Sequence, residues 1–235
     1  HTVDQNKEFS AKIEIREGHI NPGYNEEKGV NHPVLFTGMN PVVWDGEDFV
    51  ETTEDDPAWY DYDNKIWANA KSGDGSYWVW IPRYAYKITS GYNSSETGTI
   101  DVKFLKGRTN EPVDETVIET EGYDPNGKNT STHHFLHPAF QFNGDELGFW
   151  IAKYQPNNSD GTPKIEPNAT IWTSITVSNA FNVSLEMKNK TETYGWLPEE
   201  VDTHMLTNQE WGAVAYLSKS KYGAHEEEVW INNSR

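Results

Sequence analysis

The sequence predicts an α+β fold that is rich in β-structure. Apolar residues make up only 35% of the 235 residues, yet the chain contains 10 Trp, 12 Tyr and 9 Phe. Each aromatic side chain buries a large area, so a core can form with few aliphatic residues. Short alternating segments are frequent, whereas helical periodicity occurs in only two places. This combination favours a loop-rich, mainly β protein over a helical bundle.

The first alternating segment lies near the N-terminus, within residues 1–29, which we interpret as a strand and its tether. Apolar and polar residues alternate there as in a half-buried strand, and the apolar set is Phe9, Ala11, Ile13 and Ile15. Gly18 and Asn21-Pro22-Gly23 separate this strand from the next apolar segment. It is either an ordinary edge strand of its own domain or an assembly strand that adds to a sheet in a neighbouring molecule.

Residues 30–140 form an aromatic-rich region in which we expect several strands. Asp45-Gly46 is a hairpin signal between Pro41–Trp44 and Phe49-Val50. Tyr77–Ile88 carries bulky side chains at successive positions, which is typical of a strand covered on both faces, and Pro82 predicts a bend within it. A cluster of aromatic residues precedes this strand and is our candidate for ligand binding by exposed rings: Trp59, Tyr60, Tyr62 and Trp67.

The sequence predicts no metal site and no cofactor. The chain has no Cys, which excludes disulfides and thiolate ligands. His133, His134 and His137 are close in sequence and would suit zinc, but no helical periodicity supports them and a fourth ligand is not evident. We therefore interpret these histidines as structural.

The net charge of the chain limits its partners. The formal charge is −18, with 37 acidic against 19 basic residues. Nucleic acids and anionic membranes require a basic face, so neither is an expected partner. No run of residues is long and apolar enough to span a membrane, and we expect no membrane insertion.

Two helices are expected in the last third of the chain. Val177–Lys190 carries a stripe that includes Ala180, Val183 and Met187, with Ser178 as the expected cap. The second helix follows Thr207, whose hydroxyl can accept from a first-turn N–H while Glu210 reaches back to complete a capping box. The expected buried face of this helix contains Trp211, Val214 and Ala215.

Three segments in this part of the chain resemble, in order, the formylglycine-generating-enzyme (sulfatase-modifying-factor) domain, a variant of the C-type lectin fold. They are Gly148–Tyr154, Trp172–Ala180 and His204–Ala215, with Trp150, Trp172, Thr207, Glu210 and Trp211 as fold-defining residues. The resemblance covers about residues 140–220. His204 stands where the family has Arg, and Gln155 where it has Glu. The chain also resembles uncharacterised clostridial and phage-encoded surface or minor structural proteins, some of which start with a pilin-like hydrophobic segment.

The resemblance implies an incomplete C-type-lectin-like domain with two helices over residues 141–235. Family domains continue well beyond the second helix, whereas this chain has 25 residues after Glu210. The family enzymes oxidise a substrate Cys with a Cys pair, and this chain has none. What the resemblance implies instead is a display scaffold of the kind found in adhesins and phage tail-tip proteins. An incomplete sheet must pair its open edge, and the strand around Phe9–Ile15 is our candidate for that edge in a neighbour.

Three functions follow from these observations. The first is a non-enzymatic extracellular structural protein at a bacterial cell surface or in a virion: a filament subunit or phage tail component that self-associates into an oligomer. The second is an adhesin that binds a cell-surface glycan or a protein receptor. The third is an enzyme. The sequence argues against it, because we find no paired carboxylates and no arrangement of a nucleophile with its base. Glu210 is explained by its position in the capping box.

Overall fold

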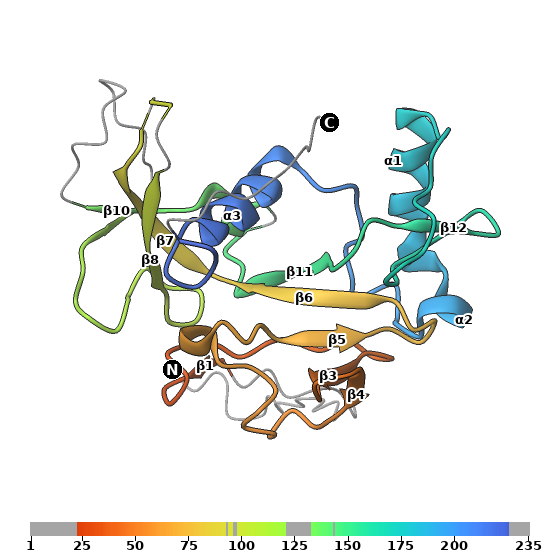
Figure 1. The fold of residues 1–235 in the computed structure, drawn as a ribbon, viewed down its shortest axis with the longest axis horizontal. Coiled ribbons are helices and arrows are strands. Elements are labelled where there is room, and N and C mark those ends of the chain that lie inside the picture. Colours follow the sequence, from red (N-terminus) through yellow and green to blue (C-terminus); the bar gives the residue numbers. More distant parts are fainter. Residues whose placement is uncertain (1–22, 93, 96–97, 121–132, 143, 226–235) are drawn as a thin grey trace, which may run out of the picture.

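The computed structural model describes residues 23–92, 94–95, 98–120, 133–142 and 144–225, and it confirms a β-rich α+β fold. A five-stranded antiparallel sheet forms the centre, in the order β11 (Gly148–Ala152), β6 (Tyr77–Pro82), β5 (Asn69–Lys71), β3 (Asn40–Trp44) and β4 (Phe49–Glu51). The predicted Asp45-Gly46 hairpin joins β3 to β4. The long strand β6 and its neighbour β11 cross the middle of the molecule (Figure 1).

A second sheet continues from the first. Its order is β8 (Thr99–Phe104), β7 (Tyr84–Ser90), β10 (His134–Leu136) and β9 (Ile118–Glu119). Two short ribbons complete the described strands: β1 (Tyr24–Asn25) with β2 (Val30–Asn31), and β12 (Asn157–Ser159) with β13 (Thr162–Lys164). The helices are α1 (Val177–Glu186), α2 (Thr191–Tyr194) and α3 (Asn208–Ser218), with 3-10 turns at Tyr62–Asn64, Pro138–Gln141 and Met187–Asn189.

Arg83 is the single residue between β6 and β7, where the chain leaves one sheet for the other, next to the predicted bend at Pro82. Its side chain is buried, with 1% of its surface exposed. The guanidinium donates to five acceptors: the carbonyls of Thr109, Phe140 and Glu146, Asn110 Oδ1 and Asp145 Oδ1. A buried cation requires such partners. Here they come from two connections, the one between β8 and β9 and the one between β10 and β11, so Arg83 ties both connections to the junction of the sheets.

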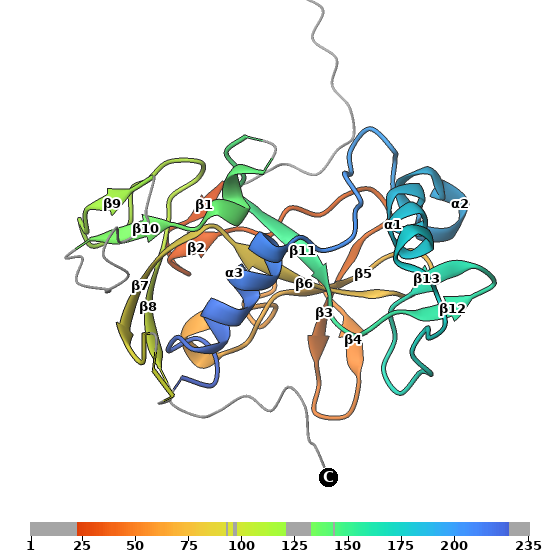
Figure 2. The same cartoon turned by 90° about the horizontal axis from the view of Figure 1, so that it is seen from above.

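One aromatic core lies across both sheets. Helix α3 lies on one side of the β6–β11 pair, above it in Figure 1 and in front of it in Figure 2. Tyr84 of β7 donates from its hydroxyl to the Ala213 carbonyl of α3 at 2.7 Å. A single cluster of buried residues includes Val30, Trp80 and Leu217. Because β11 pairs with β6, the boundary predicted after residue 140 falls within a shared sheet and a shared core.

A smaller cluster of buried residues packs beside α1 and α2 and consists of Ile165, Met187, Tyr194 and Trp196. Its attachment to the main sheet depends on glycines. Gly38 has φ +78°, and a Cβ there would lie 2.4 Å from the carbonyl carbon of Gly195. The Gly73 N–H donates to the Tyr194 carbonyl at 2.7 Å. The backbone at Gly38 and Gly73 therefore lies directly against the backbone at Tyr194-Gly195, and a side chain larger than that of glycine at Gly38 would prevent this contact.

Candidate functional site

A cavity of about 820 Å³ runs along β11 and is the candidate site. Every residue from Glu146 to Pro156 lines it. Successive side chains of a strand point to opposite faces of a sheet, so a cavity that touches all of them must lie along the edge of the strand. The edge concerned is the one opposite β6, because β11 is the outermost strand of its sheet.

The outer edge of β11 has backbone groups that no described residue pairs. Lys153 donates from its N–H to the Tyr77 carbonyl, and Arg83 donates from its N–H to the Leu147 carbonyl. In an antiparallel ladder, bonding to one neighbour alternates along the strand. The backbones of Phe149 and Ile151 therefore face β6, and those of Gly148, Trp150 and Ala152 face the cavity. Within the described ranges, no hydrogen bond reaches the N–H or C=O of these last three residues.

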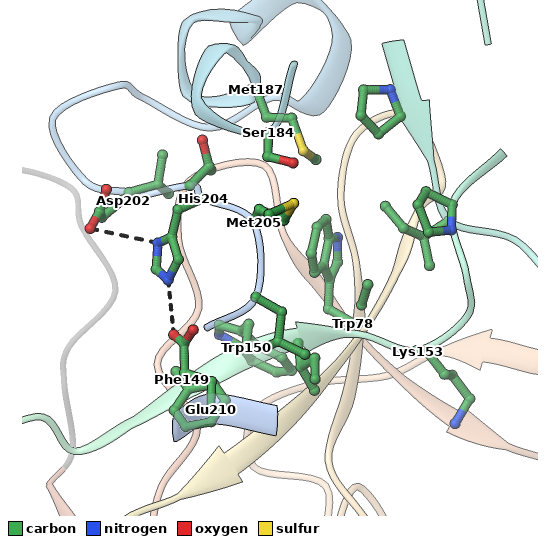
Figure 3. Close-up of a pocket in the computed structure, with 18 of the residues that line it drawn as sticks. Trp78, Phe149, Trp150, Lys153, Ser184, Met187, Asp202, His204, Met205 and Glu210 are labelled. Atoms are coloured by element: carbon green, nitrogen blue, oxygen red, sulfur yellow. Dashed lines mark hydrogen bonds and ion pairs between the residues drawn. The ribbon is translucent and has the colours of Figure 1, made fainter. Parts of the chain in front are cut away.

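The walls of the cavity are mostly aromatic and apolar. Trp150 is fixed by an indole hydrogen bond to the Val34 carbonyl at 2.6 Å and by its contact with Trp80, whose ring centroid lies 5.3 Å away. Trp78 and Trp196 form an edge-to-face pair at 5.9 Å. Trp172, predicted to define the fold, also lines the cavity. Figure 3 shows the side chains of Met187 and Met205 directed between α1 and β11. An apolar, adaptable wall of this kind suits apolar side chains of a partner segment.

Helix α1 forms the wall opposite β11. The predicted stripe is confirmed in its position, because Ala180, Val183, Ser184 and Met187 all line the cavity. The predicted cap is wrong: Thr176, not Ser178, accepts from the Asn179 N–H at 3.2 Å and begins the helix at Val177. No residue of α1 is buried. Ala180, Val183 and Ser184 therefore face the cavity rather than core, whereas Met187, just after the helix, is buried. This arrangement leaves room for a further segment between α1 and β11.

A charged pair closes one end of the cavity. His204 Nε2 lies 2.9 Å from Glu210 Oε1, and His204 Nδ1 lies 3.8 Å from Asp202 Oδ2 (Figure 3). The second oxygen of Glu210 accepts from the Thr207 N–H and hydroxyl, so the predicted capping box is confirmed. The hydrogen bond from Glu210 raises the pKa of His204. Burial pulls the pKa of Glu210 upward, but its bonds to His204 and Thr207 outweigh burial and lower it.

Because of the His204–Glu210 pair, we expect the free energy of unfolding to depend on pH. Because the pKa of His204 is raised above 6.5, its contribution is complete below pH 6.5 and is lost as pH rises through the folded-state pKa. Because the pKa of Glu210 is lowered below 4.5, its contribution is complete above pH 4.5 and is lost as pH falls further. His204→Phe keeps the stacking of this ring on Phe142 but removes the bond to Glu210. We expect a loss of about 2 kcal/mol at pH 6.

Urea unfolding of both proteins between pH 5 and pH 9 measures this difference. The difference should shrink as pH rises above the folded-state pKa of His204. Burial lowers the pKa of His137 to about 4, which also makes stability depend on pH. Because His137 is present in both proteins, its contribution cancels in the difference between their unfolding free energies. A difference that stays constant across this range would contradict the assignment of the pair.

The predicted buried face of α3 is wrong at Trp211. Trp211 is 56% exposed, whereas Glu210, Ala213 and Leu217 are buried. The capping box turns Glu210 inward to meet His204, which rotates the neighbouring position outward. Val214 still packs against the core.

The four aromatic residues predicted to bind a ligand lie mostly in the core. Trp59, Tyr60 and Tyr62 are 1–2% exposed, so the expectation of exposed rings is wrong for these three. They contact one another through tilted or edge-to-face rings, and the Trp59 indole donates to the Asn69 carbonyl. Trp67 is half-buried and donates to the Tyr222 carbonyl at 3.2 Å. A sugar requires an open ring face, which the three buried residues do not offer.

The three histidines are held apart by separate partners. His133 pairs with Glu119 and His134 with Asp101, each at 2.8 Å, and His137 accepts from the Ala139 N–H to cap a 3-10 turn. Among the described residues, no group of three His, Asp or Glu side chains is arranged to hold a metal ion. The proposed assembly strand, with Phe9, Ala11, Ile13 and Ile15, lies outside the described residues.

Neither the cavity nor the identity of the open strand was predicted from the sequence. The available signal was Pro156, which follows the apolar segment Gly148–Tyr154 closely, because proline in sheets is confined to edge strands, strand starts and bulges. Comparison of the chain with protein-family models, with curated proteins and with solved structures gave no match. In the part of the chain that the structure covers, no helix is long and apolar enough to cross a membrane.

Proposed function

We propose that the protein is a non-enzymatic extracellular structural protein, a filament subunit or phage tail component, whose lectin-like scaffold is joined to neighbouring copies by strand exchange. The observation that carries this proposal is the unpaired edge of β11 beside an apolar cavity. An open strand edge is a template for another strand. One added strand would both pair the free N–H and C=O groups of Gly148, Trp150 and Ala152 and fill the cavity.

The strand that fits this edge is Phe9–Ile15. Its alternation places four apolar side chains on one face, which matches the apolar walls of the cavity. Its seven residues exceed the five of β11, so every free backbone group can be paired. The other face carries Ser10, Lys12 and Glu14, which suit solvent.

The tether starts close to the first residues of β11. The Gly23 carbonyl accepts from the His32 N–H, and the adjacent Asn31 donates from its side-chain amide to the Leu147 carbonyl at 2.9 Å, at the start of β11. Residues 16–22 can span about 23 Å when extended. A strand held on such a tether can leave its own molecule for the next. Head-to-tail exchange that does not close on itself builds a filament.

The surroundings of Glu210 support a structural role. Both of its oxygens are occupied by His204 and Thr207 within the molecule. A general acid or base must instead reach a proton of the substrate. The carboxylate is therefore better explained by helix capping and by closure of the cavity than by catalysis.

Analytical ultracentrifugation and electron microscopy test the proposal. We expect the natural chain to form concentration-dependent oligomers, and we expect both removal of residues 1–17 and Ile13→Asp to abolish them. Lys12→Asp places the same carboxylate on the opposite face of the strand and should leave assembly intact. Unchanged assembly after removal of residues 1–17 would reject strand exchange. Binding to a glycan array by the non-assembling variant would favour an adhesin instead.

A further inference from the structure

The central sheet has a second cavity, of about 560 Å³, which lies on the other face of β6 from the first. Alternate residues of β6 divide between the two: Trp78 and Trp80 line the first cavity, and Val79 and Ile81 line the second. Helix α3 contributes Val214 and Ser218 to its wall. The helix covers only part of this sheet face, and an apolar sheet face is stable only when another layer covers it.

Much of the wall of this second cavity is apolar. Val43 and Phe49 line it and are partly buried, whereas Trp44 and Ile66 are 57% and 47% exposed. Exposed apolar residues gathered beside a cavity indicate a surface that receives another segment.

A lysine that has no acidic partner among the described residues lies in the same cavity. Lys153 Nζ donates to Asn69 Oδ1 at 2.8 Å and lies 4.8 Å from the centroid of the Phe49 ring. Figure 3 shows its side chain directed away from the residues around His204. In the described part of the chain, no carboxylate lies within ion-pair distance of this partly buried cation. The segment that completes the site should therefore carry negative charge as well as apolar side chains.

The chain itself leaves the described region at the rim of this cavity. Gly223 and Ala224 line it. Ala224 and His225 both donate from their N–H groups to the Ser218 carbonyl, at 2.7 and 3.2 Å, which holds the exit point against the end of α3. The next residues are Glu226–Glu228, followed by the apolar run Val229-Trp230-Ile231.

We propose that residues 226–231 of the same chain dock in this cavity, with Trp230 packed on the sheet face and the glutamates beside Lys153. Trp230 lies five residues beyond His225, within a reach of about 17 Å. A tryptophan side chain buries a large apolar area in such a cavity. The acidic run supplies the counter-charge for Lys153. The segment thus completes the layer that α3 begins.

Cysteine labelling tests this proposal, because the natural chain has no Cys. Ser218→Cys places a thiol in the cavity wall, and its reaction rate with a maleimide reports whether the cavity is covered. We expect Trp230→Ala in this background to speed labelling at least about tenfold, which is about 1.4 kcal/mol of protection. Asn232→Ala is the matched control and should leave the rate unchanged.

A second measurement does not depend on the folding of a tryptophan variant. In the otherwise natural chain, Ser218→Cys should react at least about tenfold more slowly than Ser159→Cys, whose side chain is exposed at the end of β12. Equal rates at these two positions would overturn the proposal, and so would a Trp230→Ala substitution that leaves the Ser218→Cys rate unchanged in a folded chain. Slow labelling that is lost with Trp230→Ala would support it.

Discussion

Replacing Arg83 by methionine is expected to lower the free energy of unfolding by about 3 kcal/mol or more. Methionine fills a similar volume but removes all five hydrogen bonds of the guanidinium, which join the β8–β9 connection to the β10–β11 connection. The Phe140 carbonyl keeps its hydrogen bond from the Glu146 N–H. A hydrogen bond made by a charged group contributes about 1.5–3 kcal/mol, and several of them are lost here. The side chain also lies at the junction of the two sheets, so the loss should affect the cooperative unit as a whole. Urea unfolding followed by circular dichroism measures it.

Arg108→Met is the matched control for this prediction. Arg108 is exposed, and its removal should change the unfolding free energy by no more than about 0.5 kcal/mol. Equal effects of the two substitutions would mean that the hydrogen bonds of Arg83 do not hold the two connections together.

Trp59→Ala is expected to be similarly severe, with a loss of about 3–5 kcal/mol. Trp59 is 1% exposed, contacts Tyr60 edge to face, and donates to the Asn69 carbonyl, so its removal leaves a cavity and loses this hydrogen bond. Thermal and urea unfolding should both report the loss.

The control, Trp44→Ala, removes a ring that is 57% exposed and should cost far less. If Trp59→Ala folds with natural stability but loses binding to a ligand, the core assignment is contradicted, and the aromatic cluster is a binding site after all.

Local structure could be predicted from the sequence where it depends on neighbouring residues. The capping box of Thr207 and Glu210 and the hairpin at Asp45-Gly46 each involve a few consecutive positions, and both were confirmed. The outward position of Trp211 could not be predicted. It depends on His204 drawing Glu210 inward, and helical periodicity alone favours the larger apolar side chain for the core.

The pairing of strands that are far apart in the chain could not be predicted from the sequence. The partner of Gly148–Ala152 is Tyr77–Pro82, about 70 residues earlier, and nothing in either segment specifies the other. For the same reason the aromatic cluster at Trp59–Trp67 was predicted to be exposed, although a strand from a distant segment covers it. Tyr62 contacts Phe104 and donates to the Trp80 carbonyl, and neither contact is local.

The proposed function depends on the outer edge of β11 receiving the strand Phe9–Ile15. Hydrogen–deuterium exchange at individual amides of β11 tests this pairing most directly. In the natural chain, the amides of Trp150 and Ala152 should be protected, and Ile13→Asp should speed their exchange at least about a hundredfold. The amides of Phe149 and Ile151 face β6 and should remain protected in both proteins. Equal, fast exchange at Trp150 and Ala152 in the natural chain and in the variant would contradict strand exchange at this edge.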